Sequence, residues 1–226
     1  MQVLILPGLD GQAALRADFM ACLAASVPTE CLSYPDHLSG YDDLLPVIKA
    51  RMAETDEDFV LIAESFSGPL ALRIAQDPPA GLKGIIWVGS FISAPCQLPS
   101  WFADFACIAP IHRTSFRQLM NVAGFGPYGS AEARSLCADV LQDLPGKTIA
   151  ARLKETLTLR TTPARHPLRM PTFALCAGED RLLHRRTRQV FEDHGIPTEL
   201  IAGPHFLLQS RPGEVAGRVR RFCGTL

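Results

Sequence analysis

The sequence has no CxxC pair, and its cysteines follow no regular spacing. The 7 cysteines are Cys22, Cys31, Cys96, Cys107, Cys137, Cys176 and Cys223. An odd set without a pattern does not indicate a disulfide framework, and the ligand spacings of a tetrahedral zinc site are also missing. We therefore predict reduced, mostly buried thiols and no metal site.

The sequence also lacks a long apolar run and an excess of charge. No run is long enough to span a bilayer, and the N-terminal run over residues 1–6 lacks the basic flank and longer core of a signal peptide. The formal net charge of -1 provides no overall attraction to nucleic acid or to an anionic membrane. We expect a cytoplasmic protein without a membrane span or a nucleic-acid partner.

Strand-like and helix-like stretches alternate along most of the 226 residues. The expected strands lie at residues 2–6, 29–34, 59–62, 84–88, 172–177 and 198–201. Amphipathic stretches with helical spacing separate them, and this order is typical of an α/β domain. The sequence predicts a mostly parallel sheet flanked by helices on both faces.

The alternation stops between the fourth and fifth expected strands. Residues 94–170 contain no clear strand, but apolar residues recur there with helical spacing. Because a structureless loop of this length is improbable in a compact domain, we expect an inserted helical cap. The predicted organisation is a core of residues 1–93 and 171–226 and a cap of residues 94–170.

Ser65 is the candidate nucleophile. It lies between a buried strand and a helix, with the small residues Ala63 and Ser67 two positions before and after it. This arrangement is typical of a nucleophile elbow, although a serine at a helix N-terminus also serves simply as a cap.

An elbow directs the next backbone N–H, that of Phe66, at the developing oxyanion. The turn at residues 6–11 offers a second donor, Leu9 N–H, unless it is a plain strand-to-helix turn.

The acid and the base are expected after later strands. Asp180 follows the strand at 172–177 and is expected to orient a histidine, with Glu179 as the neighbouring competitor. His205 follows the next strand and is able to accept the serine proton and return it to the leaving group. The chain order Ser, Asp, His is the order found in one class of serine hydrolases.

These motifs make the chain resemble the α/β-hydrolase superfamily over nearly all of its length. They are Pro7-Gly8-Leu9-Asp10-Gly11, Ala63-Glu64-Ser65-Phe66-Ser67-Gly68, Gly178-Glu179-Asp180 and Gly203-Pro204-His205. The chain departs from the common pattern because Pro7 replaces a histidine, the elbow lacks its two glycines, and no antiparallel strands precede residue 2. The resemblance implies an α/β-hydrolase fold without those first antiparallel strands.

A second, weaker resemblance is to the carboxylesterases that cleave pimeloyl-acyl-carrier-protein methyl ester. It rests on a helical cap that follows a strand ending near residues 94–96. In that family, cap arginines hold the acidic carrier protein, and the arginines of this cap otherwise belong to solvated helix faces. The corresponding candidates are Arg113, Arg117, Arg152 and Arg160.

The sequence thus predicts a serine carboxylesterase that acts through an acyl-enzyme without a metal or organic cofactor. Its substrate is a small ester or acyl compound, and the weaker resemblance adds an acyl-carrier-protein-linked methyl ester. A thioesterase, an acyltransferase and a catalytically silent binding protein with the same fold remain alternatives. Cap aromatics either line an acyl pocket or form the cap's own core: Trp101, Phe102, Phe105 and Phe116.

Overall fold

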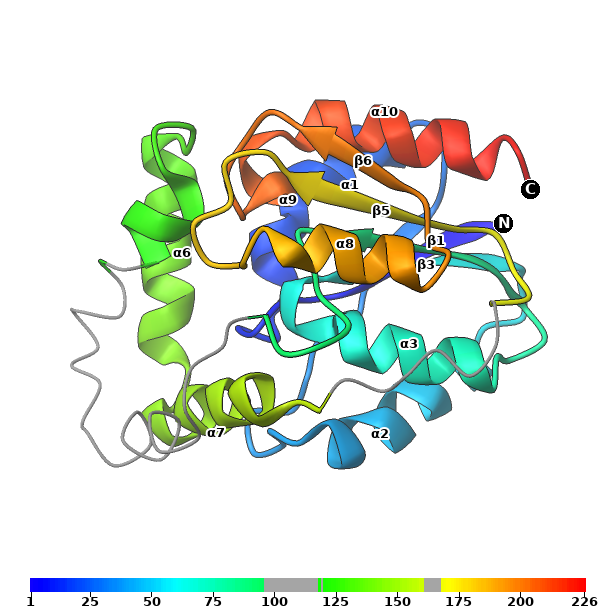
Figure 1. The fold of residues 1–226 in the computed structure, drawn as a ribbon, viewed down its shortest axis with the longest axis horizontal. Helices are drawn as coiled ribbons and strands as arrows, with labels where there is room; N and C mark the ends of the chain where they lie inside the picture. Colours follow the sequence, from blue (N-terminus) through cyan, green and yellow to red (C-terminus); the bar gives the residue numbers. More distant parts are fainter. Residues whose placement is uncertain (96–117, 119, 161–167) are drawn as a thin grey trace.

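A computed structural model describes residues 1–95, 118, 120–160 and 168–226 (Figure 1). In these ranges one sheet has the strand order β2-β1-β3-β4-β5-β6, and every neighbouring pair of strands is parallel. The strands are β1 Gln2–Leu6, β2 Thr29–Cys31, β3 Phe59–Glu64, β4 Leu82–Val88, β5 Thr172–Ala177 and β6 Thr198–Ile201. The predicted parallel sheet is therefore confirmed.

Helices connect the strands and form the remaining layers. The elements between and after the strands are η1 Ala13–Arg16, α1 Ala17–Ala24, α2 Tyr41–Ala53, η2 Ser65–Ser67, α3 Gly68–Gln76, η3 Met120–Phe125, α6 Ala131–Asp143, α7 Gly146–Thr158, α8 Arg186–Asp193, α9 Leu207–Ser210 and α10 Pro212–Cys223. None of the helices in the described ranges has the length and apolar character needed to cross a bilayer.

The buried strand β3 supplies apolar side chains to both faces of the sheet. Leu61 and Ala63 belong to one core cluster, which also contains side chains of α2, α3 and α8. Val60 and Ile62 belong to a second cluster, which contains side chains of α1, α9 and α10. Because successive strand residues point to opposite faces, a continuous apolar run is the pattern expected of a strand covered on both sides.

Residues 120–160, which lie between β4 and β5, are mostly helical. They comprise η3, α6 and α7, with no strand among them. In Figure 1, α6 and α7 lie on the side of the molecule toward which the strand arrows of β5 and β6 point. Apolar side chains of η3, α6 and α7, among them Phe125, Leu141 and Ile149, form a third core cluster.

Gly68 lies where the first turn of α3 touches the loop after β4. A Cβ atom at this position would overlap the carbonyl oxygen of Phe91 and the hydroxyl of Ser90. Since a backbone oxygen has little room to move, we expect Gly68→Ala to lower the free energy of unfolding by about 3 kcal/mol. Urea unfolding followed by circular dichroism measures this loss.

The matched control is Gly217→Ala in α10, where a Cβ would meet no heavy atom within 4 Å. There the substitution should leave stability unchanged or raise it by about 0.5 to 1 kcal/mol, because alanine is the better helix former. Equal effects of the two substitutions would contradict the close contact at Gly68.

Candidate active site

Ser65 occupies a sharp turn between β3 and α3. Its φ angle of 45° makes it the only non-glycine residue with a positive φ in the described part of the chain. Such a conformation costs about 1 to 3 kcal/mol and persists only where surrounding contacts hold it. One of these contacts is a 2.7 Å hydrogen bond that the Ser90 hydroxyl donates to the Ser65 carbonyl oxygen. The backbone therefore has the strained geometry of a nucleophile elbow.

Ser67 stands where the common elbow pattern has a glycine. Its side chain is fully buried, its hydroxyl donates to the carbonyl oxygen of Pro7, and it lies 2.5 Å from the Tyr34 hydroxyl. Both contacts join the elbow to the neighbouring strand β1 and its following loop. The departure from two glycines is thus accommodated, because the extra hydroxyl has hydrogen-bond partners in the site.

The structure brings the Ser65, His205 and Asp180 side chains together from three separate loops. Ser65 Oγ lies 2.8 Å from His205 Nε2, and His205 Nδ1 lies 2.8 Å from Asp180 Oδ2. With the imidazole hydrogen on Nδ1, His205 donates to Asp180 and accepts the serine hydroxyl hydrogen. This is the hydrogen-bond order of a nucleophile, a base and an orienting acid.

Asp180 follows β5, and its surroundings stabilise the anionic form of its carboxyl group. Its Oδ1 accepts hydrogen bonds of 2.8 Å from the N–H groups of both Leu182 and Leu183. Burial by itself would raise the pKa of this carboxyl, but the charge and hydrogen bond of His205 and the two backbone donors outweigh burial and lower it. Its other oxygen is held toward His205.

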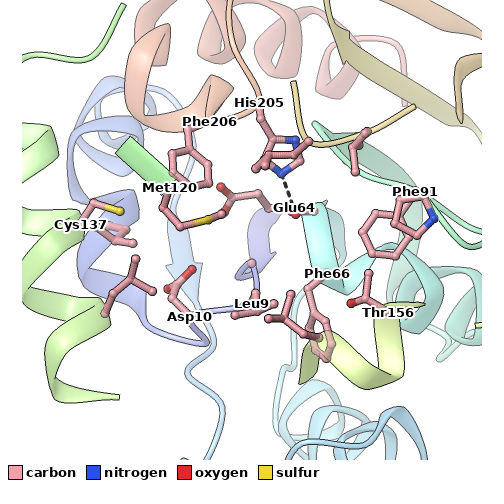
Figure 2. Close-up of a pocket in the computed structure, with 18 of the residues that line it drawn as sticks. Leu9, Asp10, Glu64, Phe66, Phe91, Met120, Cys137, Thr156, His205 and Phe206 are labelled. Atoms are coloured by element: carbon pink, nitrogen blue, oxygen red, sulfur yellow. Dashed lines mark hydrogen bonds between the residues drawn. The ribbon is translucent and has the colours of Figure 1, made fainter. Parts of the chain in front are cut away.

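His205 is almost fully buried and lies at the edge of the pocket shown in Figure 2. Burial opposes its charged form, yet the nearby carboxylates outweigh burial and raise the pKa of the imidazole above its ordinary value. The contributions are the charge and hydrogen bond of Asp180 and then the charge of Glu64. The environment therefore favours the imidazolium that forms when a histidine takes a serine proton.

The loops that carry Asp180 and His205 are joined by main-chain hydrogen bonds. Gly178 N–H donates to Ile201 O at 2.8 Å, and Glu179 N–H donates to Gly203 O at 2.9 Å. The side chain of Glu179 is exposed and accepts a hydrogen bond from Tyr128 instead of contacting His205. Of the two neighbouring acids, the structure thus places Asp180 against the histidine.

The two candidate oxyanion donors border the same pocket as Ser65. A Cβ on Gly8 would lie 3.8 Å from the Cβ of Ser65, so the turn that contains Leu9 passes directly beside the elbow. The Phe66 side chain is buried and stacks on Tyr41, with ring centroids 4.7 Å apart, which fixes the residue after Ser65. Ser65 lines the same pocket as Leu9 and Phe66. Figure 2 shows Leu9 and Phe66 in this pocket.

The pocket has a cavity volume of about 170 Å³ and a mostly apolar wall. Leu141 of α6 and Leu153 and Leu157 of α7 face the loops that carry Ser65 and His205. The aromatic residues expected to line an acyl pocket lie outside the described residues. They are Trp101, Phe102, Phe105 and Phe116.

The expectation that Arg152 contacts a carrier protein is wrong, because its side chain is fully buried. Its guanidinium donates to the carbonyl oxygens of Leu9 at 2.9 Å, Pro35 at 3.2 Å and Leu38 at 3.0 Å. The helical spacing of the sequence does not show that this face of α7 packs on the loops after β1 and β2. Of the other three candidates, Arg160 is exposed, and Arg113 and Arg117 lie outside the described residues.

A buried ion network at the pocket floor was not predicted from the sequence. It joins Asp10, Arg16 and Glu64, and each of the three lines the pocket. Gln209 of α9 donates a further 2.9 Å hydrogen bond to Glu64. The sequence does contain one indication of this network. Asp10 and Glu64 lie in motifs next to buried strands, and a buried carboxylate requires a partner.

Comparisons with known proteins agree with this architecture. A family model described as the alpha/beta hydrolase family matches residues 3–218. No curated protein matches the sequence.

Among solved structures, a hydrolase from Oleispira antarctica has a TM-score of 0.84 at 12% identity, with 100% of this chain and 91% of that chain covered. An esterase from Exiguobacterium antarcticum also has a TM-score of 0.84, at 11% identity and with 99% and 92% covered. An enol-lactonase from Burkholderia xenovorans has a TM-score of 0.80, at 12% identity and with 99% and 91% covered. These similarities concern the fold.

Proposed function

Because the chain belongs to the alpha/beta hydrolase family, we propose that it is a serine hydrolase that cleaves small carboxylic esters through an acyl-enzyme. The observation that carries the proposal is the continuous chain of two 2.8 Å contacts from Ser65 through His205 to Asp180. Ser65 also has the strained backbone that exposes a nucleophile at the end of a central strand. A triad is recognised by this geometry and not by the numbering of its members.

In the proposed reaction Ser65 Oγ attacks the ester carbonyl carbon while its proton passes to His205 Nε2. The carbonyl oxygen becomes an oxyanion, for which the N–H groups of Leu9 and Phe66 are the proposed donors. Collapse of this intermediate breaks the bond to the alcohol, which takes the proton from His205. Water then attacks the acyl-enzyme by the same route and releases the acid and free Ser65. Asp180 stabilises the imidazolium in both halves.

The acyl group is proposed to lie against the apolar wall of the pocket. Leu141, Leu153 and Leu157 come from α6 and α7, so the segment 94–170 acts in this proposal as a cap over the site. Among the described residues, the apolar lining favours an uncharged acyl chain, because the arginine of that lining, Arg16, is already paired with Asp10 and Glu64. Hydrolysis of p-nitrophenyl esters of increasing acyl length would define how much of the pocket is used.

The experiment that tests the nucleophile is covalent labelling with a serine-directed fluorophosphonate. We expect one adduct per chain, located at Ser65 by peptide mass spectrometry, because a neutral His205 hydrogen-bonded to Oγ activates that serine. Labelling should weaken at acid pH. The raised pKa of His205 means that its protonated form, which cannot accept the serine proton, persists to a higher pH than in a free histidine.

The exposed Ser26 offers an internal control, because the same reagent should leave its peptide unmodified. Absence of any adduct on folded protein would contradict the proposed nucleophile and favour a binding protein with this fold. If an adduct forms, product analysis with added alcohols distinguishes hydrolysis from acyl transfer.

A further inference from the structure

Arg16 joins two carboxylates in the buried floor of the proposed active site. Its Nη1 and Nη2 donate to the two oxygens of Asp10 at 2.5 and 2.9 Å, and its Nε donates to Glu64 Oε2 at 2.5 Å. Arg16, Asp10 and Glu64 are only 2%, 6% and 3% exposed. We refer to these three side chains as the Arg16 bridge.

The Arg16 bridge links the two chain segments that carry the proposed oxyanion donors. Asp10 directly follows Leu9, and Glu64 directly precedes Ser65 and the Phe66 donor. The guanidinium packs so closely that a Cβ on Gly8 would lie 2.9 Å from Arg16 Nη2. A single planar side chain therefore fixes the spacing between the turn after β1 and the end of β3.

Further contacts make the turn after β1 rigid. Asp10 Oδ1 accepts a 2.9 Å hydrogen bond from Gln12 N–H, and Arg16 Nη1 donates at 2.8 Å to Gln12 O. In addition, Arg152 of α7 donates to Leu9 O at 2.9 Å. Charged side chains thus hold the carbonyl group of Leu9 and both the N–H and the carbonyl group of Gln12, and such hydrogen bonds are stronger than neutral ones.

The Arg16 bridge also places charge near His205. With both carboxylates ionised and the guanidinium protonated, it carries one net negative charge, and Glu64 adds to the effect of Asp180 in raising the pKa of His205. In the described part of the chain, the charged groups that shift the pKa of the imidazole are Asp180 after β5 and Glu64 at the end of β3. Glu64, Asp10 and Arg16 line the same pocket as His205. The described helices α6 and α7 contribute uncharged lining and one titratable thiol, Cys137.

We propose that the Arg16 bridge is a positioning device for the reaction: Arg16 sets the spacing of the Leu9 and Phe66 donors, and the Glu64 carboxylate stabilises the imidazolium of His205. This inference rests on the proposed serine-hydrolase function. Buried ion pairs contribute little net stability compared with apolar side chains of similar volume, so stability alone is a weak reason for three buried charges. Asp10 and Glu64 lie next to the two chain segments that carry the proposed oxyanion donors, and this position supplies a functional reason for the buried charges.

Glu64→Gln tests the charge, because the amide oxygen can still accept from Arg16. Loss of the negative charge should move the titration midpoint of His205 to lower pH, because the charge of Glu64 helps to raise the pKa of His205. Histidine NMR, assigned with His205→Gln, measures this shift without turnover, and the acid limb of kcat/KM should move in the same direction. Glu30→Gln, which removes the same charge from an exposed residue paired with Arg51, should leave both unchanged.

Arg16→Lys tests the spacing, because it keeps the charge but cannot bridge both carboxylates through a planar fork. We expect kcat for ester hydrolysis to fall about 10- to 100-fold with little change in KM or in the acid limb. Asp10→Asn weakens the same link from the other side and is the second variant if Arg16→Lys fails to fold.

An Arg16→Lys or folded Asp10→Asn protein with wild-type kcat overturns the role in spacing. A Glu64→Gln protein in which His205 titrates at the wild-type midpoint overturns the role in charge. Both results leave the proposed hydrolase function intact, because wild-type turnover continues. A wild type that hydrolyses no ester and takes no phosphonate instead removes the proposed function and, with it, this inference.

Discussion

Ser65→Ala is expected to lower kcat for ester hydrolysis by about 10⁴- to 10⁶-fold, because it removes the atom that forms the acyl-enzyme. The side chain is small and partly exposed, and among the described residues its hydroxyl has one hydrogen-bond partner, His205. The fold should therefore persist. Initial rates on p-nitrophenyl esters, together with circular dichroism and thermal unfolding of both proteins, measure the two effects separately.

Ser26→Ala is the matched control for this substitution, since it removes a hydroxyl from an exposed residue after α1. It should retain wild-type kcat and KM. If the Ser65 and Ser26 variants were equally active, Ser65 would lose its assignment as nucleophile. The backbone strain at Ser65 would then need another explanation.

Asp180→Asn is expected to lower kcat by about 10³- to 10⁴-fold while the fold persists. An asparagine NH₂ group facing His205 Nδ1 favours the tautomer with hydrogen on Nε2, which cannot accept the proton of Ser65. The charge change has a second effect. Asp180 raises the pKa of His205, so its neutralisation should move the acid limb of kcat/KM to lower pH.

Glu179→Gln separates the two neighbouring acids. Glu179 is exposed and accepts a hydrogen bond from Tyr128. Its neutralisation should leave kcat within about twofold of wild type, as expected for a surface change. A larger loss in Glu179→Gln than in Asp180→Asn would reverse the assignment of the acid.

The fold was predictable from the sequence because its signals are local. Buried parallel strands appear as short apolar runs such as residues 59–62, and helices appear through their apolar spacing. The parallel sheet, its helical layers and the helical character of residues 120–160 follow from these patterns. Chain order also brought Ser65, Asp180 and His205 together, because parallel strands end at the same edge of a sheet.

Other features of the site could not be predicted because they depend on contacts between distant segments. Arg152 has the spacing of an ordinary helical arginine, yet it is buried against carbonyl oxygens more than 100 positions earlier in the chain. Ser67 appeared to weaken the elbow motif, but its hydroxyl contacts Pro7 and Tyr34. Such partners are identified only by their positions in space.

The sequence by itself determined the order of strands and helices and the chemical types of the candidate nucleophile, base and acid, since periodicity and motif spacing record these locally. The tertiary structure alone decided which charges are buried and paired. Arg16 meets Glu64 across 48 positions, and His205 meets Ser65 across 140. The physical reason is that hydrogen bonds and desolvation act over a few ångströms, whatever the separation of the residues along the chain.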